Sequence, residues 1–235
     1  MNAYIMAGGM ATRLKPLTDK FPKCLLSVDG IPMLHHWIDR ILRTEHFENI
    51  YVNVHHCANQ VEYWIENYSK MKKIKNIRII DEKSGLLGTA GTLFYHGETT
   101  QDFLCVYADT YSHGFFKNLS SMTAAWKSNP DNALAGLVTF NPPKDGSASC
   151  IETDFMGTIQ SFKEKVDGGL LSWAGMFFGR KEFFNELKKE DKDLAKDVFP
   201  RLCGKIRVMA HVDAYDIGRG IEEYEHFNAK VYAPR

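Results

Sequence analysis

The chain has 235 residues, of which 44% are hydrophobic and 25% are charged, so it can bury a large core and lacks the charge excess of a disordered protein. Lys plus Arg and Asp plus Glu number 29 each, which excludes a global field that would attract nucleic acid or an acidic membrane surface. The cysteines have no paired or zinc-like spacing, and the apolar N-terminal stretch is too short for a signal sequence or a membrane span. We therefore expect a cytoplasmic protein that binds anions only at a local site.

Along the first 140 residues, apolar runs rich in β-branched and aromatic residues alternate with helical patterns. We expect strands at 3–6, 50–54, 77–80, 103–107 and 134–140, with helices at 33–42 and 58–68. Strands that alternate with helices predict a mostly parallel sheet whose ligands bind at the carboxyl ends of the strands. The remaining chain predicts a hairpin of 149–153 and 158–162, strands at 173–178 and 207–212, a helical stretch at 181–203 and a final helix at 221–231.

The loop after the first expected strand contains two adjacent glycines and two basic residues. Gly8 and Gly9 let backbone N–H groups approach an anion closely, and Arg13 and Lys23 supply positive charge. This pattern favours phosphate binding, with a glycine turn and two solvated basic residues as the alternative. It matches neither the P-loop nor the dinucleotide fingerprint.

As a whole, residues 7–32 resemble the signature of the sugar-1-phosphate nucleotidylyltransferases, A-G-G-x-G-T-R-L-x-P-L-T followed by P-K and P-V-x-G-x-P. Ala11 stands where the family usually has glycine, and Ser27 where it usually has proline. The resemblance implies that Arg13 contacts the pyrophosphate leaving group and that Lys23 contacts the α-phosphate and the sugar phosphate. It also implies that the loop wraps the nucleotide phosphates with Ala7, Gly8, Gly9, Met10, Ala11 and Thr12.

A second nucleotide segment follows the third expected strand. Read alone, Gly88 and Thr89 start a helix, with Thr89 as a candidate cap. Residues 87–91 also match the family's L-G-T-A-G, which contacts the base and ribose, so the resemblance implies that Gly88 and Thr89 bind the nucleotide. Glu82 lies where relatives carry nucleotide-selecting residues.

Two aspartates are candidate metal ligands. Asp109 follows the strand at 103–107, and Asp216 lies in a D-I-G sequence near the C-terminus. Such residues are either turn and cap residues or ligands of Mg²⁺, which proteins bind through one or two carboxylates plus substrate phosphates. The family's G-D and D-x-G-T sequences supply its two metal ligands, so the resemblance implies that Asp109 and Asp216 hold Mg²⁺. Arg219 and Gly220 replace the usual Thr-Pro.

The acceptor half carries two further matches. Residues 162–165 match the family's F-x-E-K-P, which implies that Glu164 binds sugar hydroxyls and Lys165 the sugar phosphate. Residues 174–177 resemble its A-G-I-Y, where Gly175 lets the sugar lie close. Trp173 replaces the usual asparagine, and it either stacks on the sugar or fills the core. Cys150 stands where the family often has glycine, and Val166 where it has proline. Together with Trp173, these differences from the family pattern indicate an unusual acceptor.

The resemblance extends from residue 3 to about residue 228 and implies a Rossmann-like, three-layer α/β sandwich with a mostly parallel mixed sheet and no C-terminal β-helix. It implies a single domain, 1–235, in which about 1–140 bind the nucleotide and about 141–235 the acceptor. The implied reaction is Mg²⁺-dependent transfer of a nucleotidyl group from a nucleoside triphosphate to a sugar 1-phosphate, with release of pyrophosphate.

Substrate identity stays open at this stage. GTP with a mannose- or heptose-type 1-phosphate is favoured, because residues 87–91 and the chain length look most like those guanylyltransferases. Cytidylyl or uridylyl transfer to another phosphorylated acceptor, including a non-sugar phosphate, is the first alternative. A non-catalytic regulatory subunit of the same fold is the second. No nucleic acid or membrane partner is expected, and a homodimer is one option for the assembly.

Overall fold

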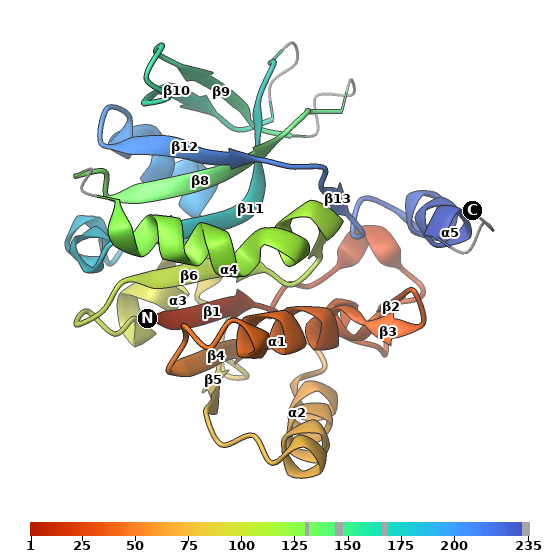
Figure 1. Cartoon of the computed structure of the whole chain (residues 1–235). Helices are drawn as coiled ribbons and strands as arrows, with labels where there is room; N and C mark the ends of the chain where they lie inside the picture. Colours follow the sequence, from red (N-terminus) through yellow and green to blue (C-terminus); the bar gives the residue numbers. More distant parts are fainter. Residues whose placement is uncertain (130–131, 144–147, 166–168, 232–235) are drawn as a thin grey trace.

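A seven-stranded sheet forms the centre of the computed structural model, which describes residues 1–129, 132–143, 148–165 and 169–231 (Figure 1). Its strand order is β12-β8-β11-β6-β1-β4-β5. The strands are β1 (Asn2–Met6), β4 (Asn49–Val54), β5 (Ile77–Asp81), β6 (Phe103–Tyr107), β8 (Ala135–Phe140), β11 (Ser172–Gly179) and β12 (Ile206–His211). All neighbours are parallel except β11, which runs antiparallel to both β6 and β8. The prediction of a mostly parallel mixed sheet is confirmed.

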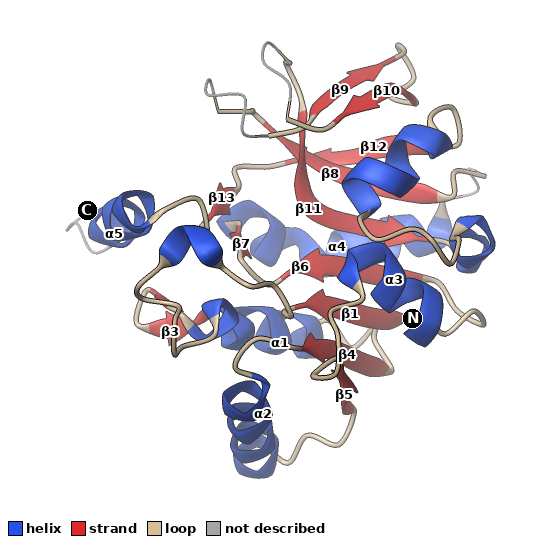
Figure 2. Ribbon diagram, turned by 180° about the vertical axis from the view of Figure 1, so that it is seen from behind, coloured by secondary structure: helices blue, strands red, loops and turns tan. Residues whose placement is uncertain are grey.

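Helices cover both faces of this sheet. The helices are α1 (Met33–Arg43), α2 (Ala58–Lys72), α3 (Gly88–His96), α4 (His113–Ser128) and α5 (Ile221–Val231). Helices α1 and α4 lie over the face seen in Figure 1, and α3 lies over the face seen in Figure 2. Alternate residues of one strand therefore enter different cores: Ile5 packs in the cluster that contains Trp37, and Tyr4 in the one that contains Leu93. The three-layer prediction is confirmed.

Three short strand pairs lie outside the main sheet, and one of them shapes the site. The predicted hairpin is present as β9 (Cys150–Thr153) and β10 (Ile159–Lys163), and β2 (Ser27–Val28) pairs with β3 (Ile31–Pro32). The pair of β7 (Thr110–Tyr111) and β13 (Tyr215–Asp216) places Asp216 opposite Thr110. Because Asp109 directly precedes β7, this pairing joins the two halves of the chain at their carboxylates.

The helical stretch expected at 181–203 is not one continuous helix. The segment instead forms three short helices, η3 (Lys181–Glu186), η4 (Leu194–Val198) and η5 (Phe199–Leu202). Aspartate side chains take backbone N–H groups that a continuous helix would use: Asp193 accepts from Ala195 and Lys196, and Asp197 accepts from Lys192 and Asp193. This is the known competition of Asp with the helical hydrogen-bond pattern.

Two findings concern what the described part of the chain lacks. None of its helices is long and apolar enough to cross a membrane. Its strands form the sheet and short pairs above, and no β-helix occurs among them. The departure predicted at Val166 lies outside the described residues.

Candidate active site

Two carboxylates and two basic residues meet beyond the carboxyl end of β6. Nζ of Lys23 contacts Oδ2 of Asp109 and lies 3.6 Å from Oδ1 of Asp216. Nη2 of Arg13 lies 3.9 Å from Oδ2 of Asp216. Lys23 starts a short helix, η2 (Lys23–Leu25), and Arg13 lies in another, η1 (Thr12–Leu14). The structure thus brings together four of the residues that the sequence singled out.

The charges of this group depend on one another. Burial opposes the charged form of Lys23, but the carboxylates of Asp109 and Asp216 outweigh it and raise the pKa of the ammonium. Burial, and then the negative charge of Asp109, raise the pKa of Asp216 against the pull of Lys23. Two carboxylates this close repel each other unless a cation lies with them. In the free protein Lys23 is that cation.

The donor set of this group fits Mg²⁺. Asp109 and Asp216 are carboxylates that already share one cation, and Mg²⁺ is commonly held by one or two carboxylates together with phosphate oxygens. Within the described ranges, no group of three or more His, Cys, Asp or Glu side chains could hold a metal on its own. A metal bound here would therefore complete its coordination with oxygens from water or from a substrate.

Gly218 makes room for Lys23. A Cβ at position 218 would lie 1.5 Å from Nζ of Lys23, so a larger residue would displace the ammonium. The Gly218 N–H donates to Oδ1 of Asp216 at 2.7 Å. Asp216 therefore also makes the turn contact that the sequence offered as the alternative to metal binding.

The glycine-rich loop, residues 7–12, is bonded to the protein on one side and exposed on the other. Oδ1 of Asn53 accepts the N–H groups of Ala7 and Gly8 at 2.6 and 3.1 Å. The exposed face carries Gly9, Met10, Thr12 and Arg13. Ala11 has a φ of 51°, in the left-handed region that favours glycine, which explains why relatives carry glycine there. Leu14 is fully buried and anchors the end of the loop.

Residues 87–91 start α3, but Thr89 is not its cap. Helix α3 begins at Gly88 without any side-chain cap. Oγ1 of Thr89 instead accepts the Tyr107 hydroxyl at 3.0 Å and the Leu194 N–H at 3.1 Å. Gly88 has a φ of 81°, and a Cβ there would lie 2.3 Å from the Lys192 carbonyl oxygen. This segment therefore packs against the start of η4, beside the acceptor side of the site.

Glu82 lies behind these loops, not on their surface. Its side chain is only 1% exposed, and its carboxylate accepts hydrogen bonds from Asn53, Thr92 and the Leu87 N–H. Glu82, which we predicted to contact the nucleotide, is therefore enclosed by protein groups in the free protein.

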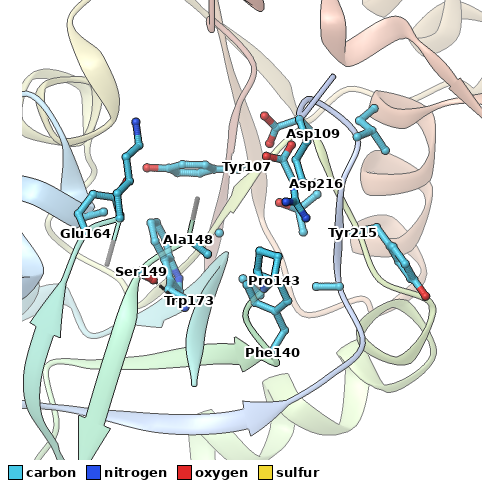
Figure 3. A pocket seen from close by; sticks show the side chains of 18 of the residues that line it. Tyr107, Asp109, Phe140, Pro143, Ala148, Ser149, Glu164, Trp173, Tyr215 and Asp216 are labelled. Carbon is cyan, nitrogen blue, oxygen red and sulfur yellow. Dashed lines mark hydrogen bonds between the residues drawn. The ribbon is translucent and has the colours of Figure 1, made fainter. Parts of the chain in front are cut away.

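A cavity of about 430 Å³ adjoins the carboxylates, and all four predicted acceptor residues line it. These are Glu164, Lys165, Trp173 and Gly175, and Arg13, Asp109 and Asp216 line it as well. Figure 3 shows Asp109 and Asp216 at one end of the cavity and Glu164 at the other, with Tyr107 between them. The metal candidates and the acceptor candidates therefore share one space.

Of the two roles considered for Trp173, the structure supports core filling, and stacking on the sugar stays a prediction. It is 8% exposed, its Nε1 donates to the Met176 carbonyl at 2.9 Å, and its ring packs 5.0 Å from that of Tyr107. It therefore fills the core and also forms a wall of the cavity. Gly175 has a φ of 72°, and a Cβ there would lie 3.0 Å from Oγ1 of Thr110 and 3.2 Å from Cβ of Tyr107.

Three side chains at the site were missed in the sequence: Asn53, Tyr107 and Asp193. Burial, and then the charge of Asp193, raise the pKa of Glu164 across the cavity. Tyr107 and Asn53 lie at or near strand ends, which is the signal that singled out Asp109. Asp193 offered no such signal, because it does not follow an expected strand.

Two relatives resemble this chain over most of its length. The chain is 27% identical to a UTP–glucose-1-phosphate uridylyltransferase of Synechocystis over 86% of its length and 55% of that protein. It is 24% identical to a mannose-1-phosphate guanylyltransferase of Mycobacterium tuberculosis over 91% of its length and 59% of the relative. The chain thus spans little more than half the length of these relatives.

A solved structure supports the fold. HddC from Yersinia pseudotuberculosis, solved with GMP-PN, superposes with a TM-score of 0.73 at 19% identity, covering 97% of this chain and 98% of that one. The nucleotidyl transferase family matches residues 2–227, which include every candidate site residue. On this match, the chain belongs to the nucleotidyl transferase family.

Proposed function

We propose that this protein transfers a nucleotidyl group from a nucleoside triphosphate to a sugar 1-phosphate and releases pyrophosphate. The observation that supports this most is the meeting of two basic residues and two carboxylates at one end of a cavity, which Lys165 also lines. Phosphoryl-type transfer requires positioning and charge neutralisation more than covalent help from the protein. Such a group of charges supplies both.

The proposed reaction is a single in-line displacement. An oxygen of the sugar phosphate attacks the α-phosphorus, the new P–O bond forms, and the bond to the bridging oxygen of the β-phosphate breaks. Arg13 neutralises the departing pyrophosphate, and Lys23 the α-phosphate. No general base is needed, because a phosphate monoester with a second pKa of about 6 is largely dianionic at neutral pH.

The remaining roles follow the position of each residue. The loop of residues 7–12, with Gly88 and Thr89, would receive the nucleotide, and Glu82 would support these segments from behind. Lys165 would bind the acceptor phosphate, and Glu164, Trp173 and Gly175 the rest of the acceptor. Residues 1–140 would thus form the nucleotide half of one domain, and residues 141–235 the acceptor half.

Asp109 and Asp216 are the residues that would hold Mg²⁺. The metal would neutralise charge on the phosphate oxygens of both substrates. In the free protein Lys23 contacts both carboxylates, so Lys23 must move away from them, toward the phosphates, when substrates bind.

We favour GTP and a mannose- or heptose-type 1-phosphate as substrates, on the likeness of residues 87–91 to those guanylyltransferases and on the relative from M. tuberculosis. Cytidylyl or uridylyl transfer to another phosphorylated acceptor, including a non-sugar phosphate, is the second candidate. The wall formed by Trp173 supports it, because its only polar side-chain atom is bonded to Met176 and is not free to bind a sugar hydroxyl. A cytoplasmic location and a homodimer stay predictions.

A substrate screen tests this proposal. Pyrophosphate release is measured with ATP, GTP, CTP, UTP and dTTP against sugar 1-phosphates and non-sugar phosphates, with Mg²⁺ present. We expect turnover with GTP and a sugar 1-phosphate. Turnover only with a non-sugar phosphate would support the second candidate, and nucleotide binding without any turnover would support a regulatory subunit.

The metal assignment has its own test. Asp109→Asn should bind the nucleoside triphosphate but lose turnover with Mg²⁺, because one of two proposed metal ligands loses its charge. If this variant turns over at the wild-type rate, Asp109 is not a metal ligand.

A further inference from the structure

A buried chain of hydrogen bonds connects the two segments proposed to receive the nucleotide. Its centre is Asn53, near the carboxyl end of β4. On one side, Oδ1 of Asn53 accepts the N–H groups of Ala7 and Gly8 at 2.6 and 3.1 Å. On the other side, its Nδ2 donates to Oε1 of Glu82 at 3.3 Å and to Oγ1 of Thr92 at 3.4 Å.

Glu82 continues the chain to the start of α3. Its Oε1 accepts the Thr92 hydroxyl at 2.5 Å, and its Oε2 accepts the Leu87 N–H at 3.2 Å. Asn53 is 4% exposed, and Glu82 and Thr92 are each 1% exposed. A buried polar group that loses its partner is costly, so each member is held in place by the others.

The donor and acceptor pattern permits one orientation of the Asn53 amide. The loop presents only N–H donors to it, and the Glu82 carboxylate presents only acceptors. A flipped amide would set donor against donor and acceptor against acceptor. A Cβ on Gly8 would lie 3.0 Å from Nδ2 of Asn53, so Asn53 also leaves little room for a larger residue at position 8. The oxygen of the Asn53 amide therefore accepts from the loop, and its nitrogen donates to the carboxylate of Glu82.

We propose that Asn53 and Glu82 are positioning residues that fix the loop at Gly8 and Gly9 relative to the start of α3. They act through these two segments, without contact with the nucleotide. Because both segments are already fixed in the free protein, the triphosphate meets a preset site and loses less binding free energy to ordering. This inference rests on the proposed function for its effect on nucleotide binding, but the arrangement itself is a property of the free protein.

The inference is tested by exchanging the amide and the carboxylate between positions 53 and 82. Asn53→Asp places a second carboxylate against Glu82 and removes the donor between them. Glu82→Gln alone sets an amide donor against either Asn53 or the Leu87 N–H, because both Glu82 oxygens accept hydrogen bonds. In the double variant, the new carboxylate at position 53 accepts from the loop and from the new amide at position 82, whose oxygen accepts from the Leu87 N–H. The Thr92 hydroxyl can reverse, donating to the new carboxylate at position 53 and accepting from the new amide at position 82, so the double variant restores the donor and acceptor matches.

Two readouts distinguish positioning from general stability. Hydrogen exchange of the Ala7 and Gly8 amides is measured in the free protein, and KM for the triphosphate is measured separately from kcat. We expect Asn53→Asp to speed exchange at both amides and to raise KM about tenfold or more, with a smaller change in kcat. The double variant should return both quantities to within about threefold of the wild type, as matched pairs do in such cycles.

Asn67→Asp is the matched control, because it adds the same charge on the exposed surface of α2 and should change neither quantity. Unchanged exchange at Ala7 and Gly8 in Asn53→Asp, or a double variant no better than the worse single variant, would overturn the inference. If Asn53→Asp does not fold, Thr92→Val replaces it, since it removes one donor to Glu82 and keeps the side-chain shape. Its Ala7 and Gly8 amides should also exchange faster, and unchanged exchange there would overturn the inference equally.

The exchange experiment also separates the two proposals. A wild-type protein that binds no nucleoside triphosphate would refute the proposed function. The effect of Asn53→Asp on the Ala7 and Gly8 amides would still support or refute the hydrogen-bond arrangement by itself.

Discussion

The nucleotide side and the acceptor side of the site are built in different ways. On the nucleotide side, loops are fixed by hydrogen bonds from backbone N–H groups to buried Asn53 and Glu82. On the acceptor side, the cavity has aromatic walls at Trp173 and Tyr107, and the carboxylates of Glu164 and Asp193 lie close enough to interact. Backbone N–H groups suit phosphate oxygens, which every nucleoside triphosphate carries, whereas side chains suit the parts of a substrate that differ from one substrate to the next.

Lys23 lies where the two sides meet, so its loss should have the largest effect. Lys23→Met should lower kcat about a hundredfold to a thousandfold, the loss typical when one preorganised donor to a developing charge is removed. Pyrophosphate release at saturating substrates measures it. Lys20→Met, on the exposed surface, is the control. More than a tenth of wild-type turnover in Lys23→Met would mean that Lys23 does not serve the reaction.

Gly175 tests how tightly the acceptor side is packed. Gly175→Ala should destabilise the protein by about 2 kcal/mol, because an alanine there is in the left-handed region and also crowds Thr110 and Tyr107. Urea unfolding measures the change. Gly114→Ala in α4 is the matched control: no atom lies within 4 Å of its Cβ position, and it should stabilise the helix by about 0.5–1 kcal/mol. Equal stability of the two variants would contradict the assigned crowding.

On the nucleotide side, a substitution at Ala11 tests whether its left-handed backbone conformation lowers the stability of the protein. Ala11→Gly should stabilise the protein by about 1 kcal/mol, because relief of a left-handed alanine exceeds the added chain entropy of glycine in the unfolded state. Ala124→Gly, on the exposed surface of α4, is the control and should destabilise by about 1 kcal/mol. If both substitutions destabilise equally, the loop holds Ala11 without strain.

Strand and helix periodicity was sufficient to predict most of the fold, and motif resemblance singled out side chains that the structure brings together around one cavity. The runs of apolar residues mark β1, β4 and β6 because each has buried residues on both faces of the sheet, whereas the edge strand β5 buries only Ile80. Nothing in the apolar run of β11 indicates its antiparallel direction, which depends on the path of the chain. The helical stretch at 181–203 is divided into short helices for a local reason, since its aspartates accept hydrogen bonds from backbone groups within five positions.

The missed site residues share another cause. Asn53 meets its partners 29 to 46 positions away, and Thr89 meets Leu194 at a separation of 105 positions. A single sequence carries no signal for such pairs, because an asparagine near a strand end or a threonine at a helix start has an ordinary local explanation. Resemblance indicated that Thr89 belongs to the site, and only the structure shows which groups its hydroxyl contacts.

The smallest effect that we predict is on the pKa of Glu164, which interacts with Asp193 on the acceptor side, and its consequence for stability depends on pH. Asp193→Asn should lower the pKa of Glu164, because the neutral amide can still cap η4 but no longer repels the carboxylate. Carbon-detected NMR titration of Glu164 measures this shift, with the exposed Asp213→Asn as the control. A Glu164 pKa equal to that of the wild type would show that burial alone raises it.

The sign of the stability effect follows from the direction of that shift. A carboxyl whose pKa is raised on folding does not lower the free energy of unfolding at pH values below its ordinary pKa of 4.5, because it is protonated in both the folded and the unfolded state. As pH rises from there through the raised value in the folded protein, ionisation increasingly favours the unfolded chain. Asp193→Asn should therefore gain thermal stability relative to the wild type as pH rises through this window, and the gain should disappear on acidification. A stability difference that is constant across the window would mean that the two carboxylates do not interact.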